Sequence, residues 1–241
     1  MKPARAFTLI ELLLAIAVIA ILAAFSLAAM GKVRSIGQKA ACANSLRQLG
    51  AATSSYLAEN DQRCFAYSRK TPEGVLWYFG LEGSGGPKAE GRRGLDQTKG
   101  PLYPYVQQTG GIQVCPAFPY GSALWKPKFK GASWGYGFNV ALSNVNTLTL
   151  DRPSRIILFG DSAQVNTFQA PASAKEPMLE EFYMIDARSR TVHFRHGENA
   201  NLLFLDGHVE AMKVYPGTED TRLKSANVGR ITPVGSTEYL R

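Results

Sequence analysis

The sequence has few of the residues on which enzyme chemistry usually depends. Among 241 residues there are 3 histidines and 3 cysteines, and no H-E-x-x-H or Walker-type motif occurs. Charged residues make up 19% of the chain, and despite a formal net charge of +8 no run of like charges resembles a nucleic-acid-binding arm. We therefore predict that the chain is not an enzyme, and we expect neither a catalytic residue nor a cofactor.

Proline and glycine are absent from the apolar stretch between Phe7 and Met30, and its only ionisable residue is Glu11. Roughly 20 helical residues span the hydrocarbon core of a bilayer. Lys2 and Arg5 precede the stretch, and positive residues favour keeping that end in the cytoplasm. We expect a single-pass protein of the inner (cytoplasmic) membrane, with its N-terminus in the cytoplasm and its head outside.

The acid in this apolar stretch needs an explanation, because a carboxylate near one end of a membrane span costs on the order of 2–3 kcal/mol. A cleavable secretory signal is one alternative, but its apolar core is usually about 7–15 residues long. A plain signal anchor is another, and neither accounts for Glu11. An acid that snorkels to the interface and has no role is the third.

The segment from Ala6 to Leu13, AFTLIELL, resembles the type IV prepilin N-terminal motif. In that family a short basic leader ends at a small residue, usually glycine, after which a prepilin peptidase cuts. The next residue, commonly phenylalanine, is N-methylated, and the fifth mature residue is glutamate. The resemblance implies a cut between Ala6 and Phe7, N-methylation of Phe7 and an assembly role for Glu11. Ala6 departs from the usual glycine.

An assembly role for Glu11 has a physical basis. A buried carboxylate without a partner would be costly in the apolar core of a filament. The new amine on Phe7 of a neighbouring subunit could pair with it, whereas a subunit in the wrong axial register would leave both charges unpaired. We hypothesise that the pair sets the register.

The helical pattern continues beyond the membrane segment, because no proline lies between Ala4 and Pro72. At 100° per residue one helix face carries apolar and small residues. These are Cys42, Leu46, Leu49, Thr53, Tyr56 and Leu57. We predict one helix from about Phe7 to Glu59 or Asn60, whose C-terminal half packs on a head domain.

Three glycines, Gly31, Gly37 and Gly50, are expected to be weak points of this helix, each costing about 1 kcal/mol relative to alanine. The expected divisions are a leader at 1–6, a transmembrane segment at 7–30, an amphipathic continuation at 31–60 and an extracytoplasmic head at 61–241.

The sequence of residues 61–241 predicts an α+β head. The Gly- and Pro-rich section 62–131 is expected to be an ordered but irregular cover. Strands are predicted at 134–140, 155–160, 191–194, 201–205 and 208–214. Asp206-Gly207 between the last two predicts a hairpin in which both turn residues take positive φ. The fold class is therefore α+β, a pilin-like lollipop whose long transmembrane helix packs on an antiparallel sheet of about four strands.

A second resemblance begins at His196, which is followed after nine residues by Asp206-Gly207. This spacing is similar to the H-x9-DG motif of a family of pilin-like proteins common in bacteria related to planctomycetes and verrucomicrobia. Related features are Cys42 to Gly50, Val114-Cys115-Pro116 and Gly135 to Asn139. The resemblance implies fold and location more than role.

His196 fits two roles. A metal site could use His193, His196 and His208 with Asp206 and Asp161, since zinc sites use histidine and aspartate. On a period-two strand, however, His193 and His196 would point to opposite faces. We favour a structural role, in which His196 bonds a carboxylate or backbone carbonyl and Asp206 shapes the turn. No metal is expected.

The three cysteines, Cys42, Cys64 and Cys115, leave one thiol over if any pair forms. The H-x9-DG resemblance includes positions matching Cys42 and Cys115, and on that basis we expect those two to pair. A Cys64–Cys115 disulfide and three buried thiols are the alternatives.

The favoured function is a structural subunit, a pseudopilin or minor pilin of a type IV pilus or type II secretion-like filament. Its partners would be a prepilin peptidase, other pilin or pseudopilin subunits and an assembly platform in the membrane. The alternative is a membrane- or filament-displayed binding module for polysaccharide, DNA or a secreted protein, with nucleic acid disfavoured. A metal-dependent head enzyme is a third hypothesis. Pilus and pseudopilus, or major and minor subunit, are not separated by sequence.

Overall fold

The computed structural model describes residues 8–86, 89–131 and 133–240, with the side chains of 26–29 left aside. The chain forms two compact units, Met1–Gly37 and Gln38–Arg241.

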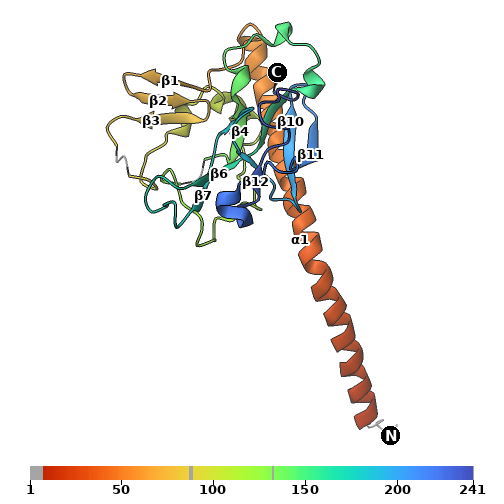
Figure 1. Ribbon diagram of the computed structural model, residues 1–241. Coiled ribbons are helices and arrows are strands. Elements are labelled where there is room, and N and C mark those ends of the chain that lie inside the picture. Colours follow the sequence, from red (N-terminus) through yellow and green to blue (C-terminus); the bar gives the residue numbers. More distant parts are fainter. Residues whose placement is uncertain (1–7, 87–88, 132, 241) are drawn as a thin grey trace. The chain divides into compact units, whose positions relative to one another are not determined.

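A single helix, α1, runs from Leu9 to Glu59 (Figure 1). It ends at Glu59, as predicted. The helix stops there because Asp61 and Gln62 take positive φ values of 51° and 56°. The amide of Gln62 donates to the carbonyl of Leu57 at 2.9 Å and so closes the last turn.

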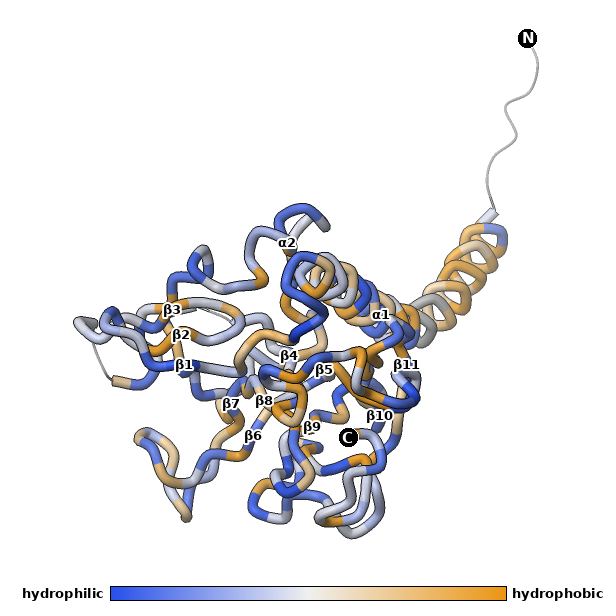
Figure 2. Tube along the Cα trace, turned by 90° about the horizontal axis from the view of Figure 1, so that it is seen from above, coloured by the Kyte–Doolittle hydropathy of each residue, from blue (hydrophilic) through white to orange (hydrophobic). Residues whose placement is uncertain are grey.

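The N-terminal part of α1 is long and apolar enough to cross a membrane. Its large side chains, such as Leu9 and Ile10, are exposed within the chain, and Figure 2 shows this part of the helix as mostly hydrophobic. A helix that is apolar all round, with no protein covering it, is typical of a membrane span.

The C-terminal part of α1 belongs to the second unit and packs there through the predicted face. Cys42, Leu46 and Leu49 are fully buried. A Cβ atom on Gly50 would lie 3.1 Å from Cδ1 of Leu203. Gly50 is therefore a point of close contact between helix and sheet, which corrects our expectation that it only weakens the helix.

The main sheet has five strands in the order β11-β10-β5-β4-β8. Their bounds are β4 Tyr136–Asn139, β5 Ile157–Asp161, β8 Met184–Ile185, β10 Asn199–Phe204 and β11 Val209–Lys213. Neighbours among β11, β10, β5 and β4 are antiparallel, while β8 joins β4 in parallel. The α+β fold with about four antiparallel strands is thus confirmed, and β8 adds a short parallel edge.

The strand predicted at 191–194 is present as β9 (Val192–His193), and it pairs with β12 (Val228–Gly229) outside the main sheet. The expectation that section 62–131 is irregular was wrong in part. The predicted irregular section contains a three-stranded meander, whose strands are β1 Ser68–Thr71, β2 Gly74–Trp77 and β3 Gly80–Gly83. These strands are four residues long, too short for alternation to be visible in the sequence.

Short elements complete the second unit. A further antiparallel pair is β6 Ala163–Asn166 with β7 Met178–Glu181, and a short helix, α2, covers Tyr103–Gln108. The 3-10 turns are η1 Gln97–Lys99, η2 Val140–Leu142, η3 Thr147–Thr149, η4 Pro153–Arg155 and η5 Thr221–Ala226.

The predicted hairpin joins β10 to β11, but its turn differs from the expected two-residue type. The amide of Phe204 donates to the carbonyl of His208, so three residues lie between the paired ends. Gly207 has a φ of 92°, whereas Asp206 does not take a positive φ. Three-residue hairpins need the left-handed conformation only at the last loop position, which is where the glycine stands.

Candidate functional site

Two places bring together the residues that the sequence singled out. The first is the start of α1, in the N-terminal unit. The second is a buried cluster in the unit from residue 38 onward.

At the start of α1, Thr8 and Glu11 bond each other in both directions. The amide and the hydroxyl of Thr8 each donate to Oε2 of Glu11 at 2.9 Å. The amide of Glu11 donates back to Oγ1 of Thr8 at 3.2 Å. This is a capping box, in which a threonine before the helix and an acid three residues later satisfy each other's free amides.

The capping box gives Glu11 a role within one chain that the sequence analysis did not foresee. The pattern T-x-x-E was present in the sequence and could have indicated it. The predicted cleavage residues Ala6 and Phe7 lie outside the described residues. Whether Glu11 also pairs with a second subunit stays a prediction.

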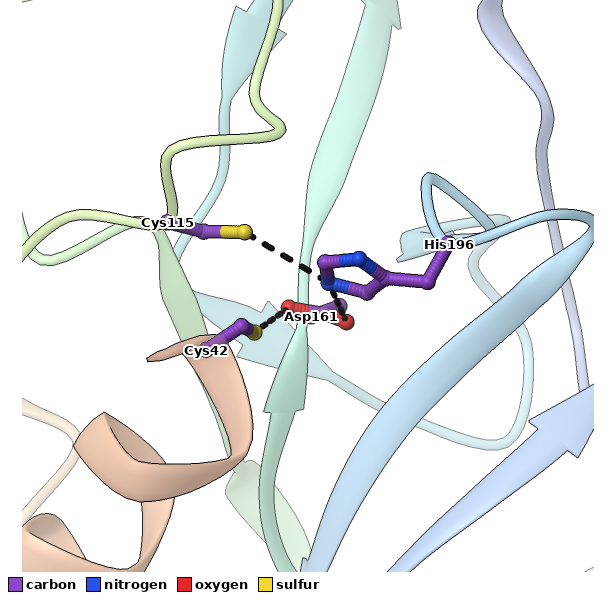
Figure 3. Close-up of side chains that lie close together, drawn as sticks. All are labelled: Cys42, Cys115, Asp161 and His196. Carbon is purple, nitrogen blue, oxygen red and sulfur yellow. Dashed lines mark hydrogen bonds and ion pairs between the residues drawn. The ribbon is translucent and has the colours of Figure 1, made fainter. Parts of the chain in front are cut away.

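The second place is a cluster of four buried side chains, Cys42, Cys115, Asp161 and His196 (Figure 3). Cys42 lies on α1, Asp161 ends β5, Cys115 precedes Pro116 in a loop, and His196 follows β9. Figure 3 shows the four side chains pointing toward one another. One potential ligand atom from each lies within 4.8 Å of those of the other three.

The contacts in this cluster converge on two groups of opposite character, the imidazole of His196 and the carboxylate of Asp161. Nε2 of His196 lies 3.5 Å from Sγ of Cys115 and 3.3 Å from Oδ2 of Asp161. The Cys42 thiol donates to Oδ1 of Asp161 at 3.0 Å.

Asp161 is held in place by two further donors. Arg195, itself 2% exposed, donates to Oδ1 from Nη2 at 2.6 Å and from Nε at 3.1 Å. The amide of Asn201 donates to Oδ2 at 2.8 Å. The Asn201 side chain also donates to the carbonyl of Lys39 on α1 at 3.2 Å, which joins the sheet to the helix at this point.

The environment shifts the pKa values of these groups. Burial alone would raise the pKa of Asp161, but Arg195 and the bond to His196 hold it well below its ordinary value. Burial opposes charge on His196, yet its contact with Asp161 raises its pKa to about 9. Burial raises the pKa of the Cys42 thiol, while the hydrogen bond from Cys42 lowers that of Cys115.

The arrangement differs from that of a Cys–His–Asp catalytic triad. A triad uses one imidazole nitrogen for the nucleophile and the other for the acid. Here Nε2 of His196 contacts both Cys115 and Asp161. Four donor atoms that face a common point are instead typical of a binding site for a single ion.

The histidines and acids considered for a metal site separate into different places. His196 and Asp161 come together, but His208 lies at the hairpin, where its Nδ1 is 2.6 Å from Oδ1 of Asp206. Asp206 also accepts from the His208 amide at 3.2 Å, a contact that stabilises the turn. His193 is buried, with Nδ1 3.3 Å from Nη1 of Arg195.

All three cysteines are unbonded thiols in the structure. Cys42 and Cys115 belong to the cluster, while Cys64 is buried elsewhere, and burial raises its pKa to about 12. The Cys42–Cys115 disulfide stays a prediction.

Arg195 is the main charged partner of this cluster, and the predictions from sequence did not include it. Two signals were available, its position directly before His196 and the charged Asp161 at the end of an apolar strand. Buried acids need a cationic or hydrogen-bonding partner, but pattern alone does not name which one.

Comparison with known proteins bears on the first of the two sites. Residues 1–27 match the family described as the prokaryotic N-terminal methylation motif. The match supports a pilin-like, prepilin-type protein and a substrate of a prepilin peptidase. No curated protein and no solved structure matches the chain. Together with the apolar part of α1, the match is consistent with a single-pass protein of the inner membrane.

Proposed function

We propose that the chain is a pseudopilin or minor pilin, a structural subunit of a type IV pilus or a type II secretion-like filament. The observation that carries the proposal is the combination of a matched methylation motif with an apolar helix that has one acid near its start. An exposed apolar helix needs a lipid or protein environment. The membrane supplies lipid before assembly, and the core of a filament supplies protein contacts after it.

The proposal assigns a life cycle to the segments of the chain. Residues 1–6 are the leader, 7–30 the membrane segment, and the rest of the chain forms a helix continuation and an extracytoplasmic head. A prepilin peptidase cuts between Ala6 and Phe7 and the amine of Phe7 is methylated. An assembly platform then moves the subunit from the membrane into the filament.

The N-terminus of the mature protein tests the first step. We expect mass spectrometry of chain isolated from membranes of the native host to find an N-methylated Phe7 as the first residue. A variant with Ala6→Glu should keep its leader, because the motif requires a small residue there, whereas Ala6→Gly should be cut at least as well as the natural chain. Mature chain that begins beyond Met30 would instead identify a secretory signal.

Filament incorporation tests the second step. We expect sheared surface filaments or overexpressed pseudopili to contain the processed chain. Processed chain that stays in the membrane under conditions in which its neighbours assemble would contradict a role as filament subunit.

A further inference from the structure

We propose that Cys42, Cys115, Asp161 and His196 bind one zinc ion in a closed structural site. The inference does not depend on filament assembly, because every ligand lies in the unit from residue 38 onward. It replaces two expectations from the sequence, that no metal binds and that Cys42 and Cys115 form a disulfide, because both sulfurs would bind the ion as thiolates.

The chemistry of the donors favours zinc. Two sulfurs, one imidazole nitrogen and one carboxylate oxygen are ligand types that structural and catalytic zinc sites use. Calcium and magnesium prefer oxygen ligands only, which excludes them here. All four residues are buried and all four positions of a tetrahedron are supplied by protein, as in structural rather than catalytic sites.

The distances among three of the four donor atoms fit a tetrahedron around zinc. Zn–S bonds of about 2.3 Å and Zn–N or Zn–O bonds of about 2.0 Å place sulfur and nitrogen about 3.5 Å apart, and nitrogen and oxygen about 3.3 Å apart. The structure has Sγ of Cys115 at 3.5 Å and Oδ2 of Asp161 at 3.3 Å from Nε2 of His196. These atoms are therefore already spaced as ligands of one ion.

The surroundings supply orientation and charge balance. Arg195 holds Oδ1 of Asp161, which leaves Oδ2 for a single bond to the ion, and the Asn201 amide fixes that second oxygen. Metal-bound groups are commonly oriented by such outer contacts. Two thiolates, one carboxylate and one guanidinium carry a combined charge of −2, so a divalent ion makes the buried site neutral, which lowers the cost of burying its charges.

The site would connect four segments that are far apart in the sequence. Its ligands come from α1, the loop before Pro116, the end of β5 and the segment that follows β9 (Figure 3). A zinc ion that binds only the folded chain stabilises the folded state, because the four ligands are far apart in the unfolded chain.

Metal analysis of the full-length chain, purified from membranes in detergent without chelator, tests the proposal. We expect about one zinc ion per chain, as a single closed site requires. The double variant with Cys42→Ser and Cys115→Ser should lose the ion, while Cys64→Ser should keep it, because Cys64 is buried outside the cluster. A natural chain without stoichiometric zinc, or with another metal in its place, would overturn the assignment, as would unchanged zinc in the double variant.

X-ray absorption at the zinc edge gives a readout that does not depend on a variant folding. We expect two sulfur ligands at about 2.3 Å and two nitrogen or oxygen ligands at about 2.0 Å. A shell without sulfur would show that the metal binds elsewhere.

Mass spectrometry of unreduced peptides is the remaining arm. It should find Cys42 and Cys115 as thiols, and a disulfide between them in most chains would overturn the zinc site.

Discussion

Arg195 directs two hydrogen bonds at one oxygen of Asp161, and His196 faces the other oxygen. Both charged partners are almost completely buried, at 2% and 0% side-chain exposure. A buried pair of this kind fixes geometry, because each charge would be costly without the other. It explains why a carboxylate can stand at the end of the apolar strand β5.

Replacing Arg195 by methionine should destabilise the second unit by about 3–5 kcal/mol, because it leaves Asp161 buried without its main partner. Chemical unfolding in detergent, followed by tryptophan fluorescence, measures this, since all three tryptophans lie in that unit. The control is Arg155→Met, which breaks an ion pair with Glu238 that is about half exposed. That change should cost less than about 1 kcal/mol. Equal losses in the two variants would contradict the assigned importance of the buried pair.

The capping box allows the charge of Glu11 to be separated from its hydrogen bonds. Glutamine serves as well as glutamate at this position of a capping box, so Glu11→Gln should leave the helix start intact. We expect the variant to enter the membrane and be cut, but not to enter filaments, since the charge for the neighbouring amine is missing. Pull-down of processed chain with sheared filaments measures this.

Thr8→Ala is the matched change for that experiment. It removes the threonine hydroxyl from the cap, at a cost of about 0.5–2 kcal/mol to the helix start, and keeps the carboxylate. This variant should still assemble. If Glu11→Gln assembled normally and Thr8→Ala did not, Glu11 would act through the cap alone.

Gly50 should not tolerate a large side chain. Its Cβ position already lies 3.1 and 3.3 Å from the two terminal methyl carbons of Leu203. Gly50→Leu is therefore expected to destabilise the second unit by about 1–3 kcal/mol through overpacking. Ala51→Leu, at the next and exposed position of α1, should change stability by less than about 0.5 kcal/mol. Thermal unfolding of both variants in the same detergent compares them, and a stable Gly50→Leu variant would place α1 farther from β10 than the structure has it.

The surroundings of Glu180 predict that part of the free energy of unfolding depends on pH in the acid range. Its carboxylate is fully buried and contacts Nζ of Lys126 at 2.6 Å and Nζ of Lys128 at 3.2 Å, with Gln164 and Asn166 as hydrogen-bond donors. Burial opposes ionisation, but the two lysines lower its pKa below the ordinary value. A lowered pKa in the folded state means that the unfolded chain takes up the proton first as pH falls.

The stabilisation from Glu180 should thus be complete above its ordinary pKa of about 4.3 and decline as pH falls through the lower, folded-state value. Glu180→Gln should be less stable than the natural chain at pH 7, and the difference should shrink as pH falls below the ordinary pKa of glutamate. Unfolding free energies at a series of pH values measure the difference. Glu238→Gln, at the exposed pair with Arg155, serves as control and should cost less than about 1 kcal/mol. A gap that stayed constant in acid would contradict the lowered pKa.

Removal of zinc should lower the melting temperature of the second unit. An ion present at about 1,000 times its dissociation constant stabilises the folded state by about 4 kcal/mol. For a unit of this size that corresponds to a shift of about 10 °C. Calorimetry with and without a strong chelator measures the shift, and the Cys42→Ser, Cys115→Ser double variant should show none. A melting temperature that does not respond to chelation would argue against a stabilising ion.

The sequence by itself determined the features that depend on near neighbours along the chain. The long helix and its stripe of Cys42, Leu46 and Leu49 follow from periodicity and from the absence of proline, and the end of the helix near Glu59 follows from Asn60-Asp61. The hairpin at Gly207 follows from its turn residues, although the type of turn did not. Local backbone preferences act over a few residues, and so they are visible in a few letters.

The tertiary structure alone decided which distant residues meet. Cys42 and Asp161 are 119 positions apart, and Cys115 and His196 are 81 apart, yet both contacts fall in one cluster. The strand that contains His193 lies outside the main sheet, where it pairs with β12 from a distant part of the chain. Such pairings depend on how a helix face, a sheet and several loops fill one core, and no local pattern in the sequence encodes that choice.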